Sequence, residues 1–147
     1  MKILILNGPN LNLLGSRDRD TYGSRTLEDI RRQVTSTFPE IELEWRQSNH
    51  EGELIDWVQT AAQSGFSGIV ANWGAYTHTS IAIRDALDAV QLPRVEVHLS
   101  NIHSREPFRE KSMTGSVMNG IITGFGADSY TLGVEAVRLL TKADRVD

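Results

Sequence analysis

The stretch ILILN at Ile3–Asn7 decides the fold class, because an unbroken apolar run that ends on a polar residue is typical of a strand buried on both faces of a parallel sheet. The same pattern returns at Ile69–Asn72 and at Val95–His98. Ligands of open α/β sheets bind beyond the carboxyl ends of the strands. We therefore expect one site where the three runs end, formed by Asn7, Asn72 and His98.

Strand and helix patterns alternate along the rest of the chain. We expect strands at 2–6, 41–45, 69–71, 94–99 and 120–125. Helical spacing of apolar residues predicts helices over 27–38, from 51 through 58, over 81–90 and over 127–140. Five βα units predict an α/β fold, a flavodoxin-like doubly wound sheet of five parallel strands in a three-layer α/β/α arrangement.

Capping residues mark the expected helix starts. Thr26 with Asp29, and Ser48 with Glu51, have the spacing of capping boxes. The hydroxyls at 77–80 are expected to cap the third helix.

Two polar stretches, 7–24 and 101–116, are unusually long for connections in such a fold. We expect a short helical turn near Phe108 in the second. Long ordered loops usually carry function, so candidate residues are sought there and at the strand ends.

Composition points to a compact protein that binds a small molecule. The 147 residues match the commonest domain size, and we expect a single catalytic domain over 1–147. A net charge of −4 gives no basis for binding nucleic acid or a membrane surface. The chain has no Cys, which excludes disulfides and thiolate chemistry. No stretch has the pattern of a signal peptide or membrane span, so we expect a soluble, cytoplasmic protein.

Glu96 and His98 are the strongest local signal for acid-base chemistry. Alternation along a strand puts both on one face, where the carboxylate would orient the imidazole and keep it protonated. The plainer alternative is a hydrogen-bonded core pair, although a carboxylate within an apolar strand is costly without a purpose.

Two loops carry further candidates. Arg17 and Tyr22 share the first polar stretch, and a tyrosine, with an ordinary pKa of about 10, becomes a plausible base only where a nearby cation favours the phenolate. His78 lies near an expected helix N-terminus, whose dipole disfavours a charged imidazole, so we expect it to be neutral. Exposed loop residues and a surface histidine are the plainer interpretations.

Metal and covalent chemistry find little support in the sequence. The four histidines form neither a His-x-x-x-His pair nor a facial triad with a carboxylate. Ser100 lacks the spacing of a nucleophile elbow, and Lys111 is the only lysine in a region that could reach the site as an imine-forming amine.

Several motifs in one order resemble the type II 3-dehydroquinate dehydratases. The resemblance covers essentially the whole chain and rests on the stretches 6–15, 22–23, 47–52, 74–80, 96–101, 105–106 and 108–109. A chance match to so many ordered motifs is far rarer than a match to one. The resemblance implies a cofactor-free anti elimination of water from 3-dehydroquinate through an enolate, giving 3-dehydroshikimate, in the shikimate pathway of aromatic amino acid biosynthesis or in quinate breakdown.

The resemblance also implies which residues do the chemistry. Tyr22 would remove the proton next to the ketone, with Arg17 favouring the phenolate and stabilising the transition state. Asn10 would position a water against the enolate oxygen. His98, oriented by Glu96, would protonate the departing hydroxyl.

The substrate-binding positions are implied in the same way. The substrate carboxylate would be held by Asn72 and the backbone amides of Leu99 and Ser100. The ring hydroxyls would be bound by His78 and Arg109.

The family's assembly is a dodecamer of four trimers. It would bring Asp85 of a neighbouring subunit into each active site. On the sequence alone, Asp85 is a polar, solvent-facing residue of the third helix.

Two positions depart from the family pattern. The segment Arg17–Asp20 has a second arginine where the family commonly has Arg-Glu-Pro, and Trp73 stands where Pro or Ala is usual, so its ring is expected to narrow the pocket or pack against a neighbour. Two rivals are a flavodoxin-like module that binds a flavin or phosphorylated ligand, and an unrelated dehydratase that works through an imine at Lys111.

Overall fold

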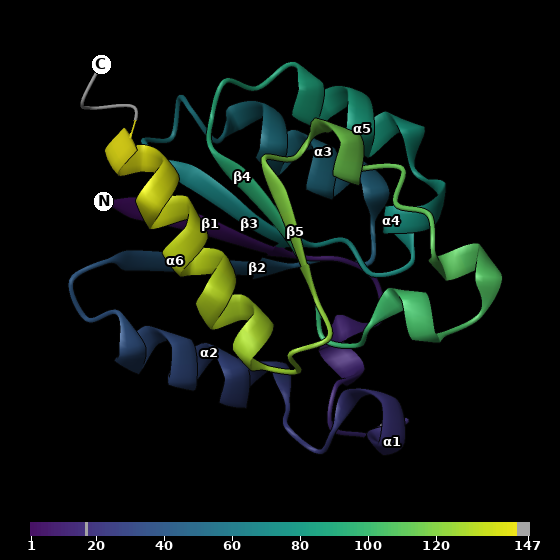
Figure 1. Ribbon diagram of the computed structural model, residues 1–147. Helices are drawn as coiled ribbons and strands as arrows, with labels where there is room; N and C mark the ends of the chain where they lie inside the picture. Colours follow the sequence, from purple (N-terminus) through teal and green to yellow (C-terminus); the bar gives the residue numbers. More distant parts are fainter. Residues whose placement is uncertain (17, 144–147) are drawn as a thin grey trace.

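The computed structural model describes residues 1–16 and 18–143, and this part of the chain forms a parallel five-stranded sheet (Figure 1). The strand order is β2-β1-β3-β4-β5, with all neighbours parallel. The strands are β1 (Lys2–Asn7), β2 (Glu42–Gln47), β3 (Gly68–Asn72), β4 (Arg94–His98) and β5 (Gly120–Thr123). The predicted flavodoxin-like α/β fold is confirmed.

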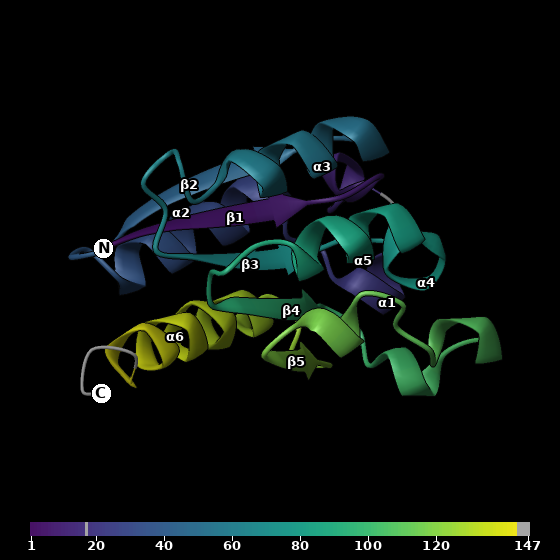
Figure 2. The ribbon, with the colours of Figure 1, turned by 90° about the horizontal axis from the view of Figure 1, so that it is seen from above.

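Helices cover both faces of this sheet. They are α1 (Arg19–Tyr22), α2 (Leu27–Thr37), α3 (Glu51–Thr60), α4 (Tyr76–Thr79), α5 (Ile81–Asp88) and α6 (Asp128–Ala143). Helices α2 and α6 lie on one face, and α3 and α5 on the other (Figures 1 and 2). Within the described residues, no helix has both the length and the apolar character needed to cross a membrane.

The alternation of β1 divides the apolar interior into two cores. Ile3 and Ile5 pack with the residues of α2 and α6, whereas Leu4 and Leu6 pack with those of α3 and α5. Successive strand side chains point to opposite faces of a sheet, so a strand buried on both faces must be apolar throughout. This requirement explains the unbroken apolar run that opens the chain.

The two expected capping boxes have different outcomes. Thr26 and Asp29 form a reciprocal capping box at the start of α2, as predicted. The box predicted at Ser48 and Glu51 is wrong, because α3 begins after His50, and Ser48 Oγ accepts the N–H of His50 instead. Ser48 is buried, and its own N–H bonds to the carbonyl of Asn7 beyond the end of β2.

Of the hydroxyl residues at 77–80 that were predicted to cap the third helix, only the last one, Ser80, does so. Ser80 Oγ accepts the N–H of Ile83 at 2.9 Å and begins α5. Thr77 and Thr79 lie inside the one-turn helix α4, which precedes α5, and do not cap it. His78 therefore also lies within a helical turn and not at the helix N-terminus expected from the sequence.

Trp73 packs inside the protein. Its side chain is fully buried in the core on the α3 and α5 face, together with Leu4 and Leu6. The expectation that this ring narrows the pocket is not met, since Trp73 follows β3 on the opposite side from Asn72.

Short turns gather at the carboxyl ends of the strands. The first polar stretch contains η1 (Leu11–Leu13) and α1, and the second contains η2 (Ile102–Ser104), η3 (Pro107–Arg109) and η4 (Gly115–Val117). The turn expected near Phe108 is confirmed as η3. In Figure 2 the strand arrowheads point toward α1, α4 and the turns η2 and η3, whereas η4 packs beside α5, and its last residue, Val117, accepts a bond from Arg94 at the start of β4.

Candidate active site

A cavity of about 150 Å³ lies where β3 and β4 end. It brings together eight of the residues singled out in the sequence, which are Asn10, Tyr22, Asn72, His78, His98, Leu99, Ser100 and Arg109. Glu96 lies directly behind His98. Arg17 lies outside the described residues.

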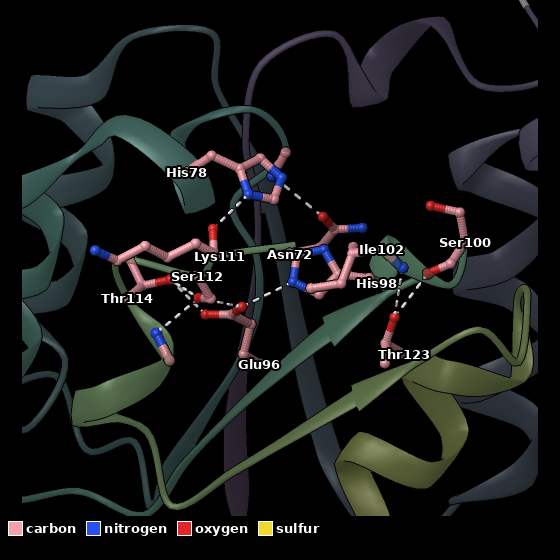
Figure 3. A network of polar contacts seen from close by, with 12 residues as sticks. Asn72, His78, Glu96, His98, Ser100, Ile102, Lys111, Ser112, Thr114 and Thr123 are labelled. Carbon is pink, nitrogen blue, oxygen red and sulfur yellow. Dashed lines mark hydrogen bonds and ion pairs between the residues drawn. The ribbon is translucent and has the colours of Figure 1, made fainter. Parts of the chain in front are cut away.

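The pair at the end of β4 has the predicted geometry (Figure 3). His98 Nε2 and Glu96 Oε1 are 2.8 Å apart, and both side chains are buried. A carboxylate accepts hydrogen bonds, so Nε2 carries a proton that it donates to Glu96. Nδ1 is then the ring nitrogen that is left to exchange a proton with a molecule in the cavity.

His78 faces the same cavity, and its hydrogen bond within the protein uses the other ring nitrogen. Its Nδ1 lies 2.8 Å from the backbone carbonyl of Lys111, which can only accept, so Nδ1 carries the proton of the neutral ring. Burial lowers the pKa of His78, and the nearby His98 and Arg109 lower it further, against the opposing effects of the Lys111 carbonyl and of Glu96. The neutral ring expected from the sequence agrees with this direction, although burial and not the helix dipole is the main cause.

Acid is expected to destabilise the wild-type protein more than a His78→Gln variant. The pKa of His78 in the folded chain is below its ordinary value of 6.5, so the unfolded chain binds the proton more readily. The neutral His78 ring makes its full contribution to the free energy of unfolding above about pH 6.5. This contribution is lost as the pH falls through the lowered pKa of His78 in the folded chain. Melting temperatures between pH 7.5 and 5 test this, with His103→Gln, at an exposed histidine, as the control. The same dependence of melting temperature on pH in all three proteins would contradict this prediction.

Asn72 is held by a chain of hydrogen bonds that crosses the sheet edge. Its Oδ1 accepts the N–H of Gly74 at 3.1 Å, and its Nδ2 donates to the Tyr130 hydroxyl at 3.2 Å. That hydroxyl donates to Asn7 Oδ1 at 2.6 Å. Burial raises the pKa of Tyr130, so the hydroxyl keeps the proton that it donates. One N–H of the Asn72 amide remains for a ligand.

The expectation that Asn7 joins the site is wrong. Asn7 is buried, its Oδ1 accepts from Tyr130, and its Nδ2 donates to the carbonyl of Arg46 at 3.1 Å. Asn7 pairs with Asn72 in the register of β1 and β3 and lies on the same α6 face, but both ends of its amide are already bonded within the protein and it does not line the cavity. Asn7 thus supports Asn72 from behind, through Tyr130.

Tyr130→Phe is expected to weaken both the fold and ligand binding. The variant leaves Asn7 Oδ1 and one N–H of Asn72 without their partner, which costs about 1–3 kcal/mol in a buried place. Urea unfolding measures this loss. A free energy of unfolding within about 0.5 kcal/mol of wild type, at an unchanged m-value, would show that the chain of bonds contributes little.

Tyr22 is the last residue of α1 and lies beside a cation. The guanidinium carbon of Arg105 is 5.1 Å from the centre of its ring. Arg105 lines the same cavity, and its Nη1 donates to Ser100 Oγ at 3.4 Å. No role was predicted for Arg105, although it belongs to the stretch 105–106, one of those that carry the family resemblance.

The second arginine of the first loop is turned elsewhere. Arg19 Nε donates to the carbonyl of Gly15 at 3.2 Å, and its side chain is exposed. Asp18 caps α1 by accepting the N–H of Thr21.

Asn10 is fixed by its backbone. It has a positive φ of 67°, and its N–H donates to Asn49 Oδ1 at 3.0 Å. The loop before it touches the loop after β3: a Cβ added to Gly8 would lie 2.2 Å from the carbonyl oxygen of Trp73, and one added to Gly74 would lie 2.9 Å from that of Pro9. The two loops therefore form one rigid wall of the cavity.

The remaining candidates occupy different surroundings. Arg109 is half-buried at the cavity, and its Nε donates to Glu106 at 2.8 Å. Asp85 is exposed on α5 and pairs with Arg84 at 3.1 Å, outside the cavity of its own chain. Lys111 is exposed, and its ammonium group points away from both imidazole rings (Figure 3). The residues described include no cluster of three or more His, Asp or Glu side chains suited to a metal ion.

Comparison with known proteins gives concordant results. The family model described as dehydroquinase class II matches residues 1–138. The 3-dehydroquinate dehydratase of Geotalea daltonii is 56% identical over 93% of this chain and 96% of its own length, and that of Chlorobaculum tepidum is 53% identical over 92% of each. The crystal structure of a type II dehydroquinase from Butyrivibrio crossotus superposes with a TM-score of 0.92 and 46% identity, over 94% of this chain and 97% of that one.

Proposed function

Because the chain belongs to the class II dehydroquinase family, whose members are hydro-lyases, we propose that its cavity performs the anti elimination of water from 3-dehydroquinate through an enolate. The observation that carries this proposal is the buried Glu96–His98 pair in one cavity with Tyr22. An aromatic base and an imidazole acid within one small cavity suit a reaction that removes a proton and a hydroxyl from neighbouring carbons.

The first step removes the proton next to the ketone. Tyr22, as the phenolate, takes this proton and becomes the phenol, while the electron pair moves into the enolate. The cation that favours the phenolate is Arg17 in the family resemblance, and the guanidinium of Arg105, 5.1 Å from the ring, is placed to add to it. Asn10 positions a water that donates to the enolate oxygen.

The second step expels the hydroxyl. The enolate reforms the ketone, the new carbon–carbon double bond forms, and the carbon–oxygen bond breaks. His98, charged and held by Glu96, gives the proton on Nδ1 to the departing oxygen, which leaves as water. Return of one proton from Tyr22 to His98 through solvent resets the site.

The other lining residues orient the substrate. The free N–H of Asn72 and the backbone amides of Leu99 and Ser100 bind the carboxylate. His78, neutral and with Nδ1 on the Lys111 carbonyl, offers Nε2 as an acceptor for a ring hydroxyl. Arg109 donates to another.

An ultraviolet assay with 3-dehydroquinate tests the function directly. Purified protein in buffer with a chelator should form the conjugated enone of 3-dehydroshikimate. A folded sample that forms no enone would contradict the proposal. Borohydride added with the substrate should cause no inactivation, because Lys111 points away from the site. Inactivation would favour the imine mechanism, and a large rise in melting temperature with a flavin would favour the binding module.

We further propose a dodecamer of four trimers in which Asp85 serves the active site of a neighbouring subunit. The support is that Asp85 is 65% exposed and lies outside its own cavity. Light scattering should give a dodecamer mass, and Asp85→Asn should raise KM. A monomer with full activity would contradict both points.

The physiological setting that we propose is the cytoplasm, in the shikimate pathway or in quinate catabolism. If deletion of the gene abolishes growth in the absence of aromatic amino acids, the role is biosynthetic. Loss of growth on quinate alone would identify the catabolic one.

A further inference from the structure

Two hydroxyl groups from one loop lie against the Glu96 carboxylate, on the side away from His98 (Figure 3). Ser112 Oγ lies 2.8 Å from Glu96 Oε1, and Thr114 Oγ1 donates to Oε2. Glu96 and Thr114 are fully buried, and Ser112 is partly buried. Together with His98, the carboxylate has three neighbours that can donate to it.

The direction of these bonds follows from the surrounding groups. The N–H of Gly115 donates to Ser112 Oγ at 2.8 Å, so the serine hydroxyl has its own proton free to donate to Glu96. Thr114 donates to the other oxygen. A buried charge is costly unless it is paired and hydrogen-bonded, and here both carboxylate oxygens are satisfied before a ligand binds.

We propose that Ser112 and Thr114 are positioning residues for the dehydration. They fix the Glu96 carboxylate in the orientation in which Oε1 accepts from His98 Nε2, so that Nδ1 stays turned toward the cavity. A carboxylate free to rotate would let the imidazole ring turn with it, and a general acid is effective only within hydrogen-bond reach of the atom it protonates. The inference rests on the proposed role of His98 as the acid.

The same loop also holds the second imidazole. The carbonyl of Lys111 bonds to His78, and the N–H of Met113 donates to the carbonyl of Thr77 at 2.7 Å. Alternate residues of the loop therefore contact α4 and β4 in turn. These bonds fix the position of the loop, and therefore of the two hydroxyls that bond to Glu96.

Thr114→Val and Ser112→Ala test the proposal, because each removes a donor with little change of volume. A hydrogen bond to a charged group corresponds to roughly a tenfold effect or more. We expect each variant to lower kcat about tenfold with KM within about twofold, and the double variant about a hundredfold. Thr114→Ser, which keeps the hydroxyl, should stay within about threefold of wild type.

Two comparisons separate positioning from a general loss of structure. Thr141→Val is the control, because it removes a partly buried hydroxyl of α6 that donates to the carbonyl of Val137. This position is far from the site in the sequence, and the variant should leave kcat unchanged. In a Glu96→Gln background, Thr114→Val should have less than a twofold further effect, since its target is already altered. Should the valine variant fail to fold, Ser112→Ala in the same background makes the same comparison.

The proposal is overturned if folded Thr114→Val and Ser112→Ala both keep kcat within twofold, if Thr114→Ser loses as much as Thr114→Val, or if only KM changes. Those results, with an active wild type and an inactive His98→Ala variant, would leave the proposed function standing. An inactive wild type would instead contradict the proposed function.

Discussion

Tyr22→Phe is expected to lower kcat by at least about a hundredfold, the usual scale for a general base. The substitution removes the oxygen that takes the proton but keeps the ring, so the contact with Arg105 and the shape of the cavity remain. KM should therefore change little. Steady-state kinetics by the enone assay give both constants, and the melting temperature confirms that the variant is folded.

Tyr76→Phe is the matched control for this prediction. Tyr76 donates through its hydroxyl to the carbonyl of Asn49 at 2.8 Å, and it does not line the cavity. Its variant should keep kcat within about threefold. Turnover near the wild-type rate in Tyr22→Phe would remove Tyr22 from the role of base.

His98→Ala is expected to cost at least about a hundredfold in kcat as well, because it removes the imidazole that gives its proton to the departing hydroxyl. The variant also leaves the buried Glu96 without its imidazole partner, so a lower melting temperature should accompany the loss. His98→Gln separates the two effects: its amide can still donate to Glu96 but cannot act as an acid. We expect the glutamine variant to be the more stable of the two and equally inactive.

The exposed His103 provides the control here, since His103→Ala removes an imidazole outside the cavity. Its kcat should equal that of wild type. A His98→Gln variant with substantial turnover would show that the hydroxyl departs without a proton from this residue.

The fold could be predicted from the sequence wherever one local rule decided the outcome. Doubly buried strands must be apolar, so Ile3–Leu6 was identified as a strand, and the Thr26 box was found because its partners are three residues apart. At Ser48 the same local rule failed, because a long-range bond to Asn7 holds this residue beyond the end of β2. Tertiary contacts decided the position of that helix start.

The residues of the candidate site were likewise predicted where a local rule applied, and missed where the partners are distant in the sequence. Glu96 and His98 were paired correctly because strand alternation is a local property. The supporting residues Tyr130 and Thr114 were missed because 58 residues separate Tyr130 from Asn72 and 18 separate Thr114 from Glu96. Asn7 was misplaced for the same reason, because the groups that bond its amide, the Arg46 carbonyl and the Tyr130 hydroxyl, are 39 and 123 residues away in the sequence.

The contact between Gly8 and Trp73, and between Gly74 and Pro9, bears on attempts to change what the enzyme accepts. A side chain at either glycine would collide with the backbone of the opposite loop, so substitutions at these two positions are expected to disturb the fold. The stretch from Ser100 to Arg109, whose residues also line the cavity, contains no glycine packed against a facing backbone. A mutant library for new substrates should therefore vary that stretch and leave the glycine pair unchanged.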